Sequence, residues 1–550
     1  MTALEVSATG AAAEAIGRHV PGLVDDRVAS RLFDRDATLW GAAAEPEASI
    51  RLGWVGLHRS SRPLVGEIAA LREELREQGV DHVALCGMGG SSLAPEVICA
   101  AAGVELTVLD SSDPQQVASA LDDRLDRTVV VVSSKSGSTV ETDSQRRAYV
   151  QAFTDAGLDP TRRIVVVTDP DSPLDQQSRA DGYRVVNADP NVGGRYSALT
   201  AFGLVPSGLA GADVAALLDD AETVADLLAD DDEANPALRL GAAMAGTDPL
   251  RDKLVLVDDG SGLPGFPDWA EQLIAESTGK AGTGVLPVVV GSSADPEVAL
   301  PPPDATVVRL AGDSDDPDPD ADSSDDTDEE QVPEGGSDVT VGGPLGAQLL
   351  LWEAATAVAG RILGINPFDQ PDVESAKKAA RSLLEDAPEQ SDPDVVDGAV
   401  EIRALGPSWL GGAATLEDAV DALLAQLDPS RGYVAVMAYL DRLAHAELAD
   451  VRSSLAIRTK RPVTFGWGPR FLHSTGQFHK GGPRVGVFLQ VTTEPREDLA
   501  VPGRDFTFGS LIAAQAAGDA RVLADLDRPV LRLHLRDVEA GLDAVRKVLG

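Results

Sequence analysis

The stretch Thr128–Thr142, TVVVVSSKSGSTVET, decides the fold. Its unbroken run of valines predicts a parallel strand that is buried on both faces. The run ends abruptly in Ser133–Thr139, which holds five hydroxyl side chains and one lysine before a helical pattern begins. Such a turn offers hydroxyls, free backbone N–H groups and the positive end of a helix, which together suit a phosphate monoester. The alternative is a purely structural turn rich in serine.

Short apolar runs alternate with helical patterns on both sides of this stretch. This rhythm is typical of parallel sheets with helices on both faces, and it restarts in the second half of the chain. We therefore expect an α/β fold with two similar halves. The other predicted strands are His82–Gly87, Leu106–Asp110, Arg163–Thr168, Tyr183–Asn187, Lys253–Asp258, Gly284–Val290 and Ala305–Leu310.

Four consecutive segments are predicted along the chain. Residues 1–60 form a helical lead-in, residues 61–235 a first α/β domain and residues 236–388 a second one. Residues 389–550 form a C-terminal α/β extension, called the extension below. Within the second domain, residues 312–338 are dominated by Asp, Ser, Pro and Glu, so they cannot bury a core and predict a disordered insertion.

Net charge, the N-terminal pattern and the length of apolar runs exclude several classes of protein. The 550 residues carry a formal net charge of −43, which argues against nucleic-acid binding because phosphate backbones need basic patches. The N-terminus lacks the pattern of a signal peptide, and no apolar run reaches the length of about 18 residues that a membrane span needs. We expect a cytoplasmic protein without membrane contact. Cys86 and Cys99 lie in apolar segments and predict buried free thiols.

Several further motifs follow predicted strands or helices. Gly87–Ser92, GMGGSS, is a glycine turn, and Arg195 follows two glycines in Gly193–Ser197. Each of these segments could also be structural. The segment Glu276–Lys280, ESTGK, resembles a nucleotide-binding loop but lacks its earlier glycine and the Ser or Thr after the lysine. No His/Cys cluster has the spacing of metal ligands, so no metal site is expected.

Five of these segments together resemble glucose-6-phosphate isomerases. GMGGSSLAPE, SSKSGSTVET, NVGGRYSAL, AESTGK and NPFDQPDVESAKK occur in the order of that family. The likeness is strongest to the isomerase fused behind transaldolase in some bacteria, which also has a segment like FLHSTGQFHKGGP. It implies two doubly wound parallel-sheet domains of the sugar-isomerase (SIS) type. It also implies interconversion of glucose 6-phosphate and fructose 6-phosphate through an enediol, without a cofactor.

The resemblance also implies roles for individual residues. Glu276 would move a proton between C2 and C1, Arg195 would stabilise the enediolate, and Lys377 would assist ring opening. The residues expected to bind the rest of the substrate are Gly90, Ser91 and Gln370 around the sugar, and Ser134, Lys135, Ser136, Ser138 and Thr139 around the phosphate.

The chain departs from the family pattern at one point. The family places a ring-opening histidine between the catalytic Glu and the final Lys motif, but no histidine lies between Glu276 and Lys377. His473 and His479, in a polar segment of the extension, are the candidates to replace it. The extension itself lies outside the common pattern.

Two other functions remain open at this stage. An isomerase that also accepts mannose 6-phosphate would use the same base. A non-catalytic sugar-phosphate sensor would need the phosphate turn but neither Glu276 nor Arg195. For partners, the resemblance allows a homodimer and an association with a separate transaldolase.

Overall fold

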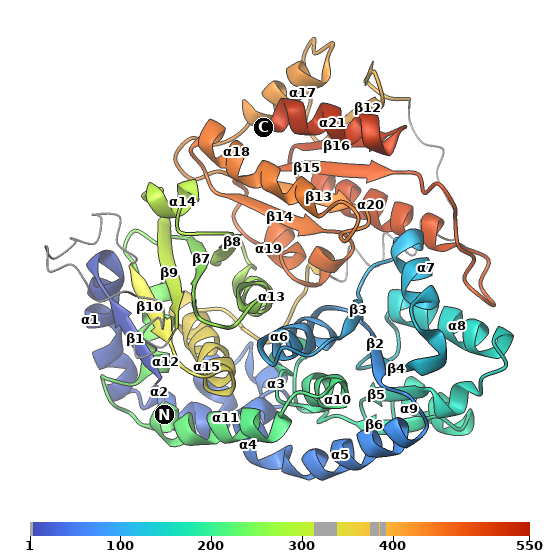
Figure 1. Cartoon of the computed structure of the whole chain (residues 1–550). Coiled ribbons are helices and arrows are strands. Elements are labelled where there is room, and N and C mark those ends of the chain that lie inside the picture. Colours follow the sequence, from blue (N-terminus) through green and yellow to red (C-terminus); the bar gives the residue numbers. More distant parts are fainter. Residues whose placement is uncertain (1–3, 313–337, 374–383, 385–391) are drawn as a thin grey trace, which may run out of the picture.

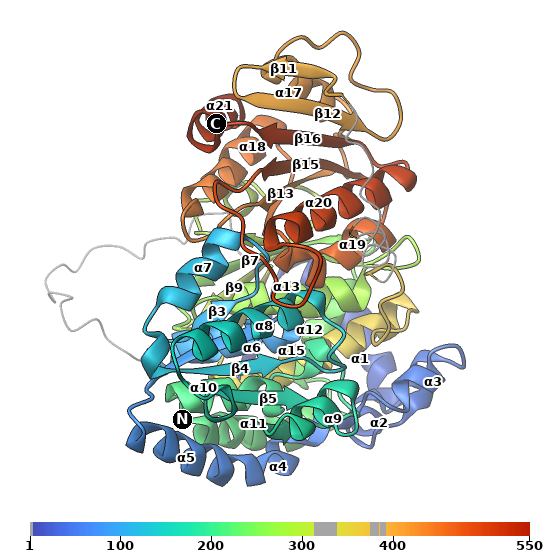
Figure 2. The same cartoon turned by 90° about the vertical axis from the view of Figure 1, so that its right-hand side faces the viewer.

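The computed structural model describes residues 4–312, 338–373, 384 and 392–550, whose strands form three sheets (Figures 1 and 2). Nearly all of the predicted insertion and Lys377 lie outside the described residues. The arrangement confirms the α/β prediction. Within the segment predicted as a helical lead-in, β1 (Glu5–Ala8) is a strand, and it is followed by α1 (Gly10–Asp25) and then by short helices up to Ser60.

The first sheet is fully parallel, with the order β3-β2-β4-β5-β6. Alternate valines of β4 enter two different apolar clusters, Val129 and Val131 on one face, Val130 and Val132 on the other. The uninterrupted valine run therefore reflects burial on both faces. The elements are β2 (His82–Gly87), β3 (Thr107–Leu109), β4 (Thr128–Ser133), β5 (Ile164–Thr168) and β6 (Arg184–Asn187), with α5 (Arg62–Glu77), α6 (Leu93–Ala101), α7 (Pro114–Asp122), α8 (Val140–Asp155), α9 (Pro173–Ala180) and α10 (Ala201–Ala210).

The second sheet has the order β1-β10-β9-β7-β8 and is parallel except for β1. Helix α13 is buried along almost its whole length, because it lies between the domains rather than on the surface (Figure 1). The elements are β7 (Lys253–Asp259), β8 (Leu286–Val290), β9 (Ala305–Ala311) and β10 (Val339–Gly342), with α1 (Gly10–Asp25), α11 (Val214–Ala229), α12 (Pro236–Ala245), α13 (Phe266–Thr278), α14 (Pro296–Ala299) and α15 (Leu345–Leu363).

The third sheet belongs to the extension and has the order β11-β12-β16-β15-β13-β14, with β16, β15, β13 and β14 parallel. It lies above the other two in Figure 1. The elements are β11 (Val395–Asp397), β12 (Val400–Leu405), β13 (Tyr433–Tyr439), β14 (Val463–Trp467), β15 (Gly486–Thr493) and β16 (Val530–Leu535), with α17 (Leu416–Leu424), α18 (Val451–Thr459), α19 (Gly476–Gly481), α20 (Phe508–Asp525) and α21 (Val538–Leu549).

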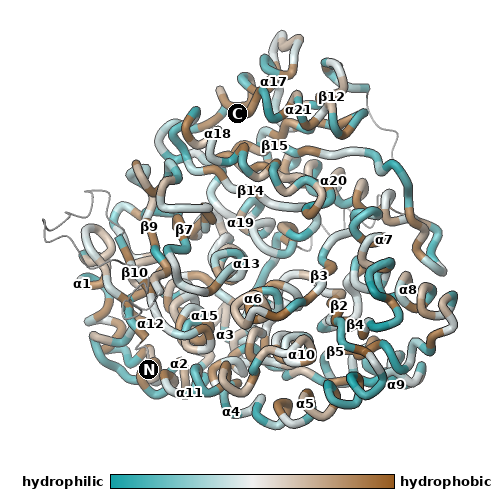
Figure 3. The backbone as a smooth tube through the Cα atoms, viewed as in Figure 1, coloured by the Kyte–Doolittle hydropathy of each residue, from teal (hydrophilic) through white to brown (hydrophobic). Residues whose placement is uncertain are grey.

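Apolar clusters join the extension to both domains. One combines Val255 and Leu286 of the second sheet with Tyr433 and Phe478 of the extension. Another brings Phe508 of α20 against the first domain. Figure 3 shows the hydrophobic residues concentrated along interior strands such as β4 and β5. This shared burial fixes the extension where it can contribute side chains to a site between the domains.

Two further predictions concern the cysteines and membrane-spanning helices. Cys86 and Cys99 are buried free thiols, as predicted. Among the described residues, no helix combines the length and apolarity that crossing a membrane requires.

Candidate active site

The hydroxyl-rich turn Ser133–Thr139, called the phosphate turn below, leads from β4 into the first turn of α8. Its hydroxyls are organised locally: Gly137 N donates to Ser134 Oγ at 3.2 Å, and Ser134 Oγ donates to Thr139 Oγ1 at 3.3 Å. Ser138 N donates to Ser136 Oγ at 3.3 Å. The turn therefore presents hydroxyls and a helix N-terminus together, which is the arrangement that favours an oxyanion.

Lys135 points away from this arrangement. Its Nζ lies 2.6 Å from Asp169 Oδ2 and donates to Val192 O at 3.0 Å and Pro190 O at 3.3 Å. The lysine charge is thus already neutralised by a carboxylate. What remains available at this position is the backbone N–H of the turn.

The glycine turn Gly87–Ser92 brings three separate segments together. A Cβ at Gly90 would lie only 1.9 Å from Gly194 O, so the turn packs directly on the segment that carries Arg195. A Cβ at Gly89 would lie 3.1 Å from His473 Cβ. The register pairs Gly87 of β2 with Ser133 of β4, which places this turn and the phosphate turn at the same edge of the sheet.

Arg195 is held rigidly in the interior, with 3% of its surface exposed. Its Nε donates to Ser277 Oγ at 2.8 Å, and its Nη2 donates to Pro367 O at 2.8 Å and Asp369 O at 2.9 Å. Its Nη1 donates to Gln370 Oε1 at 2.5 Å. These hydrogen bonds, to a hydroxyl, two backbone carbonyls and a side-chain amide oxygen, keep the guanidinium in place.

Glu276 lies beside Arg195 near the end of α13. Its Oε2 is 3.6 Å from Arg195 Nη1 and accepts from Gln272 Nε2 at 3.4 Å, and 7% of the residue is exposed. A carboxylate that can accept a proton and a fixed cation thus lie side by side. This pair can remove a proton next to a carbonyl group and stabilise the resulting oxyanion.

Lys280, for which no role was expected from the sequence, also shapes this site. Its Nζ donates to Asn366 O at 2.8 Å and to Asp369 O and Oδ1 at 2.6 and 2.8 Å. Burial, together with the nearby Arg195 charge, lowers the pKa of Lys280 to about 8. Lys280 therefore positions the segment that carries Gln370. The sequence held one signal for this role: Lys280 is the last residue of AESTGK, one of the family motifs, and NPFDQP belongs to another.

The two candidate histidines are separated by the fold. His473, in the short 3-10 helix η8 (Arg470–His473), has its Nε2 3.2 Å from Glu141 Oε1 in the first turn of α8. Glu141 also accepts from Gln515 Nε2 at 2.6 Å. His473 therefore lies between the glycine turn and the helix that follows the phosphate turn.

His479 instead belongs to the core of the extension. Its Nδ1 is 3.0 Å from Tyr433 Oη, its ring stacks on Tyr433 with centroids 5.7 Å apart, and Phe488 packs edge-on at 5.3 Å. Burial lowers the pKa of His479 well below its usual value, so the ring is neutral. The structure does not bring His479 to Glu276.

A buried ionic network fixes the segment that carries His473. Arg470 contacts Glu96 on α6 at 2.5 Å and Asp110 after β3 at 2.5 Å, and Arg442 reaches Glu96 at 3.1 Å. Ser474 Oγ donates to Glu271 on α13 at 3.1 Å. No sequence pattern indicates these residues, because ion pairs between distant segments leave no local signal.

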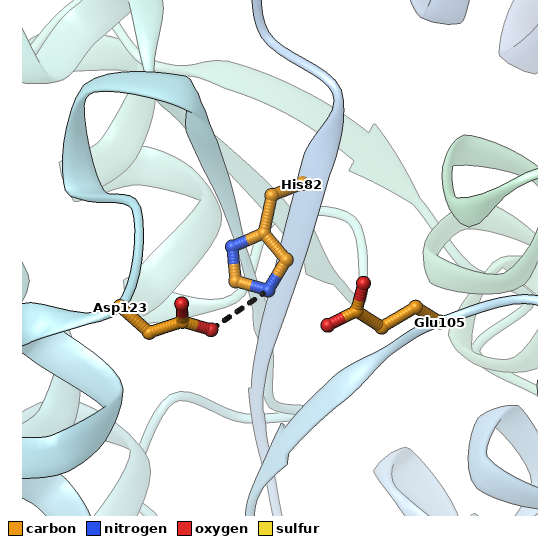
Figure 4. A group of neighbouring side chains, drawn as sticks. All are labelled: His82, Glu105 and Asp123. Carbon is orange, nitrogen blue, oxygen red and sulfur yellow. Dashed lines mark ion pairs between the residues drawn. The ribbon is translucent and has the colours of Figure 1, made fainter.

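One group among the described residues combines a histidine with carboxylates in reach of a single ion: His82, Glu105 and Asp123 (Figure 4). The side-chain atoms that could bind an ion already have protein partners. The two ring nitrogens of His82 lie 2.8 and 2.9 Å from threonine hydroxyls, and Arg124 binds both carboxylates. His82 also begins β2, at the opposite edge of the sheet from the glycine turn. This donor set does not fit a metal ion.

Comparison with known proteins agrees with this geometry. The sequence profile of the family described as phosphoglucose isomerase matches residues 73–247. A probable glucose-6-phosphate isomerase of Natronomonas pharaonis is 30% identical over 395 residues, covering 66% of this chain and 92% of that protein. A glucose-6-phosphate isomerase of Rubrobacter xylanophilus is 30% identical over 381 residues, covering 59% of this chain and 87% of that protein.

Among solved structures, a hypothetical protein of Thermus thermophilus superposes with a TM-score of 0.58 and 26% identity, over 70% of this chain and 100% of that chain. The residues that the family profile matches include the phosphate turn and Arg195. The chain belongs to the phosphoglucose isomerase family.

Proposed function

We propose that this protein interconverts glucose 6-phosphate and fructose 6-phosphate by moving a proton between C2 and C1 of the open-chain sugar. The observation that carries the proposal is the buried pair of Glu276 and Arg195, 3.6 Å apart. The names of the family relatives give the same reaction.

The phosphate group anchors the substrate. The hydroxyls of Ser134, Ser136, Ser138 and Thr139 and the N–H groups of the phosphate turn receive it at the start of α8. Since the phosphate does not react, its binding energy orients the sugar for the chemical step. Gly90 and Ser91 line the space beside the sugar, and the absence of a side chain at Gly90 lets the turn pack against the Gly194 backbone next to Arg195.

Glu276 and Arg195 carry the proton transfer. The Glu276 carboxylate takes the proton from C2 of the aldose and returns it to C1, and the reverse reaction uses the same group. Negative charge then develops on the substrate oxygens, and Arg195 stabilises it. Gln370, which accepts from Arg195, keeps the guanidinium oriented. Because Arg195 supplies the positive charge, we propose that the reaction needs neither a metal nor an organic cofactor.

His473 opens the sugar ring in this proposal. The imidazole moves a proton between the C1 hydroxyl and the ring oxygen, while Glu141, 3.2 Å away, holds the imidazole in position. Lys377 is proposed to assist the same step. The extension would then complete the active site by supplying the histidine that the common family pattern places elsewhere.

We further propose that the enzyme works in the cytoplasm as a homodimer, with a separate transaldolase as a potential partner chain. Light scattering coupled to size-exclusion chromatography, with and without transaldolase, tests both assemblies. A single monomeric mass across the working concentration range would contradict the dimer.

Turnover of fructose 6-phosphate, coupled to detection of glucose 6-phosphate in the presence of a chelator, tests the reaction. The wild type should turn over, and Glu276→Gln should lose about 10³-fold or more in kcat while still binding substrate. Mannose 6-phosphate as the substrate in a matching assay shows whether the enzyme also accepts this sugar phosphate. If the wild type binds fructose 6-phosphate without turnover, a non-catalytic sensor replaces the isomerase.

A further inference from the structure

A cavity lies within the extension, at the carboxyl ends of three parallel strands. It has a volume of about 340 Å³ and lies between the sheet and α20. Tyr439 of β13, Thr492 of β15 and His534 of β16 occupy paired positions across these strands and line it. Ligands of open α/β sheets bind at this edge of the strands.

Arg532 lines the same cavity, two residues before His534 and therefore on the same face of β16. Among the residues that the structure describes, its guanidinium has no hydrogen bond and no ion pair, and its Nε is buried. Burial lowers the pKa of Arg532, with the positive charge of Arg403 acting in the same direction. A cation in such surroundings is costly unless an anion compensates it.

Arg532 differs from the other buried arginines of this chain; even Arg528, which is 2% exposed and has no carboxylate partner among the described residues, donates to three backbone carbonyls. With 89 acidic and 46 basic residues, carboxylates outnumber cations almost twofold, and the other buried guanidiniums near the domain contacts, such as Arg470 and Arg452, each bind two carboxylates. Arg532 is left without one inside a cavity. This pattern is expected where the anion comes from a ligand.

Tyr439 gives a second, independent indication. The residue is 3% exposed, and its hydroxyl is buried without a hydrogen-bond partner among the described residues although it lines the cavity. A buried hydroxyl without a partner costs free energy that a ligand can recover. The nearby Asp519 is neutralised by Lys480 at 2.6 Å.

Two acidic residues, Glu494 and Asp498, lie exposed at the rim. One oxygen of Asp498 accepts from Leu499 N and Gly509 N, so this carboxylate is engaged in the loop before α20. The interior of the cavity is therefore the cationic part.

We propose that this cavity binds a small metabolite through an oxyanion group, a phosphate monoester or a carboxylate, with Arg532 as the cation and the Tyr439 hydroxyl as a donor. A planar guanidinium can bind either group with two parallel hydrogen bonds. The site is separate from the isomerase reaction. It adjoins η8, since Tyr439 packs edge-on against Phe471 at 5.6 Å, two residues before His473.

Equilibrium dialysis of the full chain with labelled inorganic phosphate tests the proposal. We expect two phosphates per chain, one at the phosphate turn and one in this cavity. Arg532→Gln should remove the phosphate in the cavity, and Tyr439→Phe, which keeps the ring, should weaken its binding several-fold. Arg536→Gln is the matched control, because Arg536 is an exposed residue that follows the same strand.

Malonate distinguishes the two ligand chemistries. If malonate displaces the Arg532-dependent phosphate at lower concentration than phosphate itself does, the ligand is a carboxylate, and the opposite order indicates a phosphate monoester. The proposal is overturned if folded Arg532→Gln binds as much phosphate as the wild type, or if the wild type binds only the phosphate that a Ser134→Ala and Thr139→Ala double variant loses. Failure of the isomerase proposal would instead appear as absent turnover of fructose 6-phosphate and would leave the Arg532-dependent site intact.

Discussion

At the scale of single residues, the two histidines of the segment His473–His479 should respond oppositely to substitution. His473→Ala removes a side chain that faces Glu141 across the candidate site, so kcat should fall by about 10²-fold or more with little change in Tm. His479→Ala leaves a cavity among aromatic rings and should lower the free energy of unfolding by roughly 2–4 kcal/mol. Steady-state kinetics and thermal unfolding of both variants measure these effects, and full activity of His473→Ala would remove that histidine from the mechanism. The sequence placed both side chains in one polar segment and could not separate them. Their difference arises because Tyr433 and Phe488, distant in sequence, surround only His479.

At the scale of elements, η8 is fixed by Arg470, whose side chain is 15% exposed and pairs with Glu96 and the fully buried Asp110. Arg470→Ala leaves both carboxylates without this cation, so we expect a loss of about 3 kcal/mol in the free energy of unfolding and a lower kcat, because His473 loses its support. Arg546→Ala is the control, since Arg546 pairs with Glu447 on the surface, and should change stability by less than about 1 kcal/mol. Equal urea midpoints for the two variants would contradict this assignment. The strand β4 and the phosphate turn could be predicted, because their signal is local: a valine run followed by hydroxyls. The ionic network and the pairing of β1 with β10 could not, because each depends on contacts between segments far apart in the chain.

At the scale of the whole molecule, the extension is tied to the first domain by Asp143 of α8, which binds Arg146 and Arg147 of the same helix and Arg504 of the extension. Burial opposes ionisation of Asp143, but the hydrogen bonds from Arg147, Arg146 and Arg504 outweigh it and lower its pKa from 3.8 to about 2. A pKa that is lower in the folded than in the unfolded state stabilises the fold above pH 3.8, and this contribution disappears as the pH falls towards 2. The difference in unfolding free energy between wild type and Asp143→Asn should therefore be about 2 kcal/mol at pH 6 and shrink below pH 4. Urea unfolding at a series of pH values measures it, and a difference that stays constant down to pH 3 would contradict the ionic origin of the contact. Because η8 belongs to the extension, the same acidification should reduce activity in wild type before global unfolding, as the docked extension holds His473 beside Glu141.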